Sequence, residues 1–186
     1  MILSGDSIRV VHPLFPVEGD GSIPISPLQL HFGDCSLDYA KAFNKKYHSR
    51  LPVFRQTIAK ACFSAIYKNR YYACAIWSNP SSAMIDKTWI ELKRFVITDD
   101  APKNTASRMM SWMVREIKKR FPECPRIISY QDPQVHDGTI YKASGWVNTG
   151  SRKSGGFSNT KVRYREKDQA PGDKIRWEKM LLKVGT

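Results

Sequence analysis

Hydrophobic positions recur along the chain with two periods, and these periods predict helices and strands in alternation. The clearest helical pattern covers residues 105–121, where apolar side chains repeat every three or four positions and basic side chains occupy the other face. Pro122 ends this helix, because proline cannot continue it. A shorter helical pattern covers residues 36–46 and begins at Ser36, a good N-cap residue. The buried stripe of the longer helix is predicted to comprise Ala106, Met109, Met110, Met113, Val114 and Ile117.

Segments rich in β-branched and aromatic residues predict strands. The first two of these strands are expected to form a hairpin about the turn Asn69-Arg70. In the third, a regular alternation would place Glu91 on a different face from Arg94. The predicted strands cover residues 57–67, 71–78, 88–98 and 126–130, with a further strand starting at Trp146.

A short helix is predicted over residues 139–144, with Gly145 as its stop signal. The succession of strand, long helix and strand after residue 88 implies a parallel pair joined by a right-handed crossover. We therefore expect an α/β fold with one central mixed, mostly antiparallel sheet flanked by helices, formed by residues 29–150.

The two ends of the chain differ in character from this central part. Residues 1–28, rich in Pro, Gly and Ser, are expected to form an extended lead-in with a short strand at 8–11. Residues 151–186 are expected to be a basic C-terminal extension with a helical stretch near Asp173–Lys183. That extension holds ten basic and four acidic residues, so it is either a solvated tail or an arm that binds nucleic acid.

The charge of the whole chain favours a polyanionic partner. Its 30 basic and 17 acidic residues give a formal net charge of +13, which promotes nucleic-acid binding through phosphate neutralisation. The alternative is an ordinary basic surface. No apolar run approaches the roughly 18 residues of a membrane span, and the N-terminus lacks a secretory pattern, so we expect a cytoplasmic protein. Four cysteines without a CxxC pair predict reduced, structural thiols.

Three short segments could carry chemistry. The turn at 99–104 leads from a strand into a helix N-terminus, where free N–H groups and the helix dipole favour a phosphate. Asn104 would cap this helix or hold the loop, and Arg108 could add positive charge; an ordinary capped turn is the alternative. Asp132, held extended before Pro133, follows a strand end, where it is either functional or a turn former.

The remaining candidates are Tyr141 and His48. Tyr141, in the short helix, could donate a proton to a leaving group or simply pack its ring. His48, in the loop YHSR, could be a general base or a metal ligand, although a lone histidine is more often neither. Neither a GxxxxGK[ST] nor a GxGxxG motif is present.

Taken together, these segments resemble the phage Mom-type DNA-modification proteins, divergent members of the GNAT acyltransferase superfamily. The resemblance covers about residues 29–151. It rests on an ordered set of motifs, with the loop around His48 as a weaker match. The motifs are ELxR at Glu91–Arg94, APKN at Ala101–Asn104, SYxDP at Ser129–Pro133 and GTIYxAxGW at Gly138–Trp146.

The resemblance implies a GNAT-like acyltransferase fold and a phage protein that acts in the bacterial host cell. It implies acyl-CoA-dependent modification of the exocyclic amine of adenine in DNA, which protects phage DNA from restriction. By position, Arg94, Asp132 and Tyr141 match the family's functional residues. The His48 region matches a suggested iron-binding patch, with Asp132 as a further metal ligand. The cofactor, acetyl-CoA or a related acyl-CoA, would contact Arg94, Asn104, Thr105, Ala106, Ser107, Arg108 and Tyr141.

Two departures from the wider superfamily are visible. The usual pyrophosphate loop Q/RxxGxG/A is absent, and Pro102–Ala106 stands in its place, as in other Mom-type proteins. The loop from Asp132 to His136 is one residue shorter than usual. Two alternatives stay open: an N-acetyltransferase acting on protein, tRNA or a small amine, and a non-catalytic basic nucleic-acid-binding protein. The sequence also leaves the oligomeric state open, a homodimer included.

Overall fold

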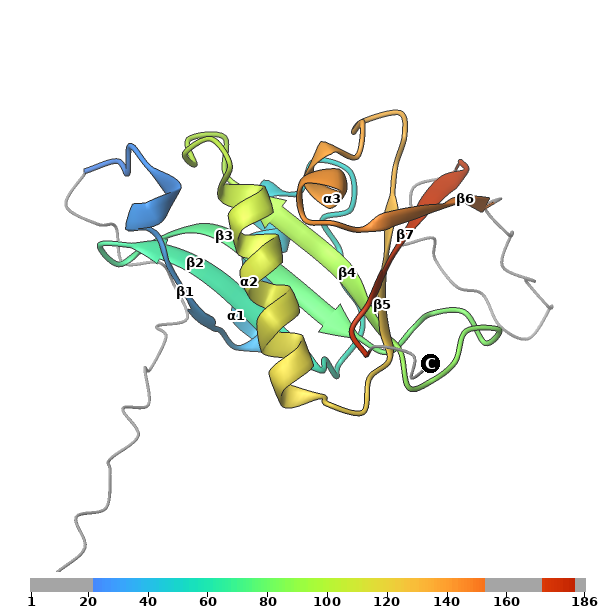
Figure 1. The fold of residues 1–186 in the computed structure, drawn as a ribbon. Helices are drawn as coiled ribbons and strands as arrows, with labels where there is room; N and C mark the ends of the chain where they lie inside the picture. Colours follow the sequence, from blue (N-terminus) through green and yellow to red (C-terminus); the bar gives the residue numbers. More distant parts are fainter. Residues whose placement is uncertain (1–21, 153–171, 183–186) are drawn as a thin grey trace, which may run out of the picture.

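The computed structural model describes residues 22–152 and 172–182, and their core is a seven-stranded sheet in the order β1-β2-β3-β4-β5-β7-β6 (Figure 1). Within these residues, β4 and β5 form the parallel pair and every other neighbouring pair is antiparallel. This is the mixed, mostly antiparallel sheet that the sequence predicts. The strands are β1 His31–Asp34, β2 Ala61–Tyr67, β3 Arg70–Ser78, β4 Ile90–Ile97, β5 Arg126–Gln131, β6 Val147–Arg152 and β7 Lys174–Met180.

Helices cover both faces of the sheet. Helix α1 (Leu37–Tyr47) packs on one face, whereas α2 (Thr105–Arg120) and α3 (Thr139–Ala143) pack on the other (Figure 1). A short 3₁₀ helix, η1 (Pro27–Gln29), precedes β1. The larger core lies under α2, whose buried side chains are those of the predicted stripe except that Thr105 replaces Ala106.

Local signals in the sequence explain where these elements begin and turn. The Ser36 hydroxyl accepts a hydrogen bond from the Tyr39 N–H at 3.1 Å and caps α1, as predicted. The β2–β3 hairpin is confirmed, but its turn is Lys68-Asn69, one residue earlier than expected. Both residues have positive φ, 43° and 64°, which matches the twist of a tight hairpin.

The helix expected near Asp173–Lys183 is wrong. Lys174–Met180 forms strand β7, which pairs with β5 on one side and β6 on the other. A strand is favoured here because residues 175 and 177 point to the apolar core while 174, 176 and 178 point to the other face. Part of the basic C-terminal extension is therefore an interior strand of the sheet.

Other expectations fall partly outside the described residues. The strand expected at 8–11 and most of the lead-in lie outside the described residues, and so do residues 153–171 of the C-terminal extension. All four cysteines are described and none forms a disulfide. No helix among the described residues is long and apolar enough to cross a membrane.

Candidate active site

The parallel strands β4 and β5 separate partway along their length. Their register runs from Ile90↔Ile127 to Leu92↔Ser129 and stops there, although β4 continues to Ile97. Ligands of open α/β sheets bind beyond the carboxyl ends of parallel strands. We describe the predicted residues Arg94, Asp132, Tyr141 and His48 from this opening, and those of the β4–α2 turn after them.

A β-bulge changes which side chains of β4 share a face. Ile76 pairs with Arg94 and the next residue, Trp77, pairs with Leu92, so Lys93 is the extra residue. The expectation that Glu91 and Arg94 lie on different faces is therefore wrong. Glu91 pairs with Ser78, and both it and Arg94 point to the α1 side of the sheet.

On the α2–α3 side of the opening, Tyr141 is buried among aromatic rings. Its ring stacks on Trp177, with centroids 5.2 Å apart and planes 10° apart, and meets the edge of Trp146 at 5.6 Å. Its hydroxyl lies 2.9 Å from the Ser129 hydroxyl. Burial raises the pKa of Tyr141, and the hydrogen bond with Ser129 offsets part of that rise. The phenol therefore keeps its proton at neutral pH.

Glycine is required at position 138, just before α3. Gly138 has φ +77°, and a Cβ there would lie 2.5 Å from the Trp177 ring and 2.7 Å from the Gln131 amide oxygen. That amide oxygen accepts a hydrogen bond from the Trp177 indole N–H at 2.6 Å. The close approach lets α3 bring Tyr141 onto Trp177, which explains the glycine of the GTIY motif.

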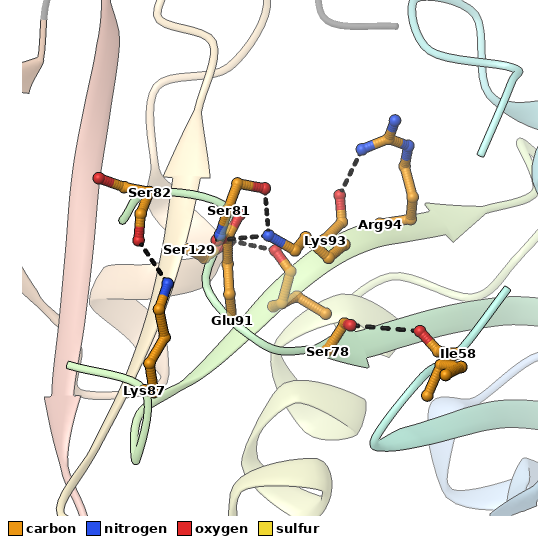
Figure 2. A network of polar contacts seen from close by, with 10 residues as sticks. Ile58, Ser78, Ser81, Ser82, Lys87, Glu91, Lys93, Arg94 and Ser129 are labelled. Carbon is orange, nitrogen blue, oxygen red and sulfur yellow. Dashed lines mark hydrogen bonds and ion pairs between the residues drawn. The ribbon is translucent and has the colours of Figure 1, made fainter. Parts of the chain in front are cut away.

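On the α1 side, a buried ion pair occupies the bulge (Figure 2). The Lys93 ammonium lies 2.6 Å from a Glu91 carboxylate oxygen and donates to the Ser81 hydroxyl at 2.5 Å. The Ser81 N–H donates to the same Glu91 oxygen at 2.9 Å. These bonds hold the β3–β4 loop against the opening. Sequence reasoning missed Lys93, because a bulge leaves no periodic signal.

Arg94 is buried beside this pair and anchors the α1–β2 loop. Its guanidinium donates to the Lys93 carbonyl at 2.8 Å and the Val53 carbonyl at 3.2 Å (Figure 2 shows the first). It also lies 5.4 Å from the centroid of the Phe54 ring. Asn44 holds the same loop from α1 by donating to the carbonyls of Leu51 and Pro52.

His48 ends α1 and lies on this side of the sheet. Its Nδ1 accepts hydrogen bonds from the N–H groups of Arg50 and Leu51, at 3.3 and 3.2 Å. Burial, together with the charges of Arg94 and His136, lowers the pKa of His48 to about 4. A neutral ring that accepts at Nδ1 carries its proton at Nε2, so this geometry makes His48 a hydrogen-bond donor.

Asp132 lies between two cations from distant parts of the chain. Its Oδ2 is 3.1 Å from Arg50 of the α1–β2 loop and 2.9 Å from Lys174 of β7. Burial raises the pKa of Asp132, but hydrogen bonds from Lys174 and the Gln134 N–H, with the charges of Lys174 and Arg50, outweigh it. The pKa is lowered overall, and the group is a carboxylate at neutral pH.

The two candidate residues at the β4–α2 turn, Asn104 and Arg108, have different surroundings. Asn104 is the N-cap residue of α2, with φ 67°, but its side chain makes no capping hydrogen bond. The Arg108 guanidinium donates to the carbonyls of Pro27 and Leu30 and lies over the Phe32 ring. Its side chain therefore fixes the segment before β1 onto α2.

The described residues do not fit the iron site suggested for His48 and Asp132. They contain no group of three His, Cys, Asp or Glu side chains placed to hold a metal. The Nδ1 of His48 and the Oδ2 of Asp132 are already engaged by N–H groups and cations. No third ligand accompanies them in this part of the chain.

The model of one protein family matches most of the chain. The Mom protein family model covers residues 39–180, which include most of α1 and all of β4, α2, α3 and β7. No curated protein sequence matches the chain significantly.

Solved structures with the same fold are acetyltransferases. One is the ribosomal-protein-S18-alanine N-acetyltransferase from Escherichia coli, with a TM-score of 0.59, 12% identity and coverage of 84% of this chain and 96% of that chain. Another is a putative acetyltransferase from Salmonella typhimurium with its cofactor acetyl-CoA, with a TM-score of 0.60, 10% identity and coverage of 85% and 97%. A Bacillus subtilis acetyltransferase in complex with CoA has a TM-score of 0.57, 12% identity and coverage of 83% and 99%. The fold of this chain is thus that of the GNAT acetyltransferases.

Proposed function

The chain belongs to the Mom protein family, and from this premise we propose that it is an acyl-CoA-dependent enzyme that modifies the exocyclic amine of adenine in phage DNA. Such a modification would protect that DNA from restriction enzymes. The observation that carries the proposal is the opening between β4 and β5, where a protonated, buried Tyr141 lies on one side and the ionised Asp132 on the other.

The N-terminus of α2 suits the pyrophosphate of the cofactor. The first N–H groups of a helix have no partner within it, and here the Asn104 side chain leaves them uncapped. Ala106 and Ser107 would present these groups to the pyrophosphate, with the helix dipole adding attraction. Thr105 is occupied in the turn, since its hydroxyl donates to the Pro102 carbonyl at 2.7 Å. When bound, the cofactor would supply an acyl thioester.

Tyr141 would serve as the general acid. Its raised pKa keeps the proton available until a stronger base, the departing thiolate, forms nearby. The Trp146 and Trp177 rings pack against the Tyr141 ring, and the residue is 8% exposed.

Asp132 and Arg94 would serve the acceptor side. The lowered pKa of Asp132 makes it a weak base, which favours orienting the acceptor amine through an N–H hydrogen bond over deprotonating it. Arg94 would support the same wall by holding Val53 and Phe54 in place and by adding positive charge near the acyl group. His48 would add a hydrogen-bond donor.

DNA binding would bring the target base to this opening. A base in a duplex has to be flipped out before its amine can react. Arg115, Lys118 and Lys119 are exposed on the outer face of α2 and would contact phosphates. The basic residues of 153–171 would add to this contact.

The decisive experiment is mass spectrometry of nucleosides from plasmid DNA of cells that express the chain. We expect a new adenine derivative with the wild type and at least about a tenfold smaller amount with Asp132→Asn, which removes the charge but keeps the side-chain volume. Unmodified DNA, together with transfer to a peptide, tRNA or small amine, would instead support the N-acetyltransferase alternative.

A second measurement separates catalysis from simple nucleic-acid binding. Acetyl-CoA at millimolar concentration should raise the melting temperature, because a ligand that binds only the folded state stabilises it. No shift, combined with tight DNA binding, would favour a non-catalytic basic protein.

A further inference from the structure

Ser129 connects the Tyr141 hydroxyl to the point where β4 and β5 separate. It is 2% exposed and forms the last pair of the parallel register, opposite Leu92. Its hydroxyl lies 2.9 Å from that of Tyr141 and 3.3 Å from the Leu92 carbonyl oxygen. Ser129 is labelled in Figure 2, which draws this part of the polar network.

The two contacts of Ser129 determine where its proton and that of Tyr141 point. The Leu92 carbonyl can only accept, so Ser129 donates to it. Ser129 has a single hydroxyl proton, and Tyr141 must therefore donate to Ser129 at rest. The phenolic proton is thus held toward β5.

The Tyr141 ring has little freedom to choose another partner. It is stacked on Trp177 and meets Trp146 edge-on. Within the described residues, Ser129 supplies the one hydrogen bond to the Tyr141 hydroxyl. The direction of the Ser129 hydroxyl therefore determines the hydrogen bonding of the Tyr141 hydroxyl, the group that would lose its proton.

We propose that Ser129 is a positioning residue for acyl transfer and that it acts through Tyr141. When Tyr141 loses its proton, the Ser129 hydroxyl rotates from the Leu92 carbonyl to the Tyr141 phenolate oxygen. The inference rests on the proposed function. The acceptor amine nitrogen would form the new C–N bond to the acyl carbon while the C–S bond breaks. The leaving sulfur would take the Tyr141 proton to form an S–H bond, and a phenolate would remain. The Ser129 O–H then donates to that phenolate. The proton that the acceptor amine releases passes to water, and water returns one to the phenolate, which restores both hydroxyls.

The rotation of the Ser129 hydroxyl costs little free energy, because the contact that it leaves is the weaker of its two. Ser129 gives up a 3.3 Å bond to a neutral carbonyl and gains one to a charged oxygen 2.9 Å away. Hydrogen bonds to charged groups are roughly twice as strong as neutral ones. Leu92 and Ser129 stay fixed by strand pairing, so only a hydroxyl rotates.

The test is a double-mutant cycle with Ser129→Ala and Tyr141→Phe in purified protein. CoA release from acetyl-CoA is measured with an adenine-containing single-stranded oligonucleotide. We expect Ser129→Ala to lower kcat about tenfold to a hundredfold, the typical effect of losing a hydrogen bond to a charged group. The KM for acetyl-CoA should change less than about twofold. In the Tyr141→Phe background the serine change should have no further effect, because no phenolate forms there.

The matched control is Ser64→Ala on β2. Ser64 is also fully buried in a strand, and its hydroxyl has no hydrogen-bond partner in the described part of the chain. It should retain wild-type kcat. If Ser129→Ala proves too unstable, Ser129→Cys keeps the volume with a weaker donor and should show the same non-additivity.

The outcomes separate this inference from the proposed function. A wild-type protein that is active and a Ser129→Ala variant with the same kcat would overturn the role of Ser129 alone. Losses that multiply in the double variant would also overturn it, since they mean that Ser129 acts independently of Tyr141. A wild-type protein that transfers acyl groups to no acceptor would overturn the proposed function and with it the inference.

Discussion

The two faces of the sheet at the β4–β5 opening have opposite characters. On the α2–α3 face, Tyr141 is enclosed by Trp146, Trp177 and the Ser129 hydroxyl. On the α1 face, the groups are charged and paired: Lys93 with Glu91, and Asp132 with Arg50 and Lys174. Strand β7 supplies a residue to each set, Trp177 to the first and Lys174 to the second, because residues an odd number of positions apart in a strand point to opposite faces.

This difference assigns the two titratable candidates to different tasks. The apolar face raises the pKa of Tyr141, so the phenol stays protonated, and the charged face lowers the pKa of Asp132, so the carboxyl stays ionised. Environments that push two pKa values apart are how one site provides both a proton donor and an anion. A single opening in the sheet thereby offers an acid on one side and a hydrogen-bond acceptor on the other.

The largest effect is expected from deleting residues 172–186. Strand β7 supplies Trp177 to the aromatic face and Lys174 to the charged face, and it joins β5 to β6. We expect the truncated chain to lose its cooperative thermal transition, measured by circular dichroism. A truncated protein that melts like the wild type would show that the sheet does not depend on β7.

Tyr141→Phe tests the aromatic face alone. The change removes a hydroxyl without opening a cavity, so we expect kcat to fall on the order of a hundredfold while the melting temperature changes little. Steady-state CoA release and a melting curve measure the two. Tyr39→Phe is the control, because that buried tyrosine of α1 packs on Tyr71 of β3. Equal kcat in both variants would remove Tyr141 from the chemistry.

Lys93→Met tests the charged face. The Lys93 and Glu91 side chains are 4% and 7% exposed, so removing the ammonium leaves a buried carboxylate without its cation. Such a loss typically costs about 3–5 kcal/mol of unfolding free energy, and replacing both partners costs much less. In urea unfolding, Lys93→Met should therefore have a smaller unfolding free energy than the double variant Glu91→Gln/Lys93→Met.

Lys87→Met is the matched control for this ranking. The Lys87 ammonium is exposed and donates to the Ser82 carbonyl at 3.1 Å on the same loop (Figure 2). Its replacement should change the unfolding free energy by less than about 0.5 kcal/mol. Equal stability of Lys93→Met and Lys87→Met would mean that the Glu91–Lys93 pair is not buried in solution.

The smallest effect concerns His48 and acid. Its folded pKa of about 4 lies below the ordinary value of 6.5, so folding favours the neutral ring. The stability that this provides is complete above pH 6.5 and is lost as the pH falls toward 4. His48→Gln, which cannot titrate, should lose less stability between pH 6.5 and 4.5 in urea unfolding. Parallel pH profiles of the two proteins would contradict the lowered pKa.

Much of the fold could be predicted because it depends on neighbours in sequence. The apolar stripe of α2, the Ser36 cap of α1 and the β2–β3 hairpin are local patterns, and the structure confirms them. The strand–helix–strand order also determined the parallel β4–β5 pair, since a right-handed crossover is the rule. The point at which these two strands separate is known only from their register.

The tertiary structure alone decided what lies around that opening. Asp132 meets Arg50 from 82 positions earlier and Lys174 from 42 positions later, and no local pattern encodes such a pairing. The bulge at Lys93, which turns Glu91 and Arg94 to one face, depends on the register with β3. Residues 174–180 became a strand because β5 and β6 offered backbone partners on both sides. Local periodicity determines the type of an element, whereas register and long-range pairing determine which side chains meet, because those contacts form only when distant segments pack together.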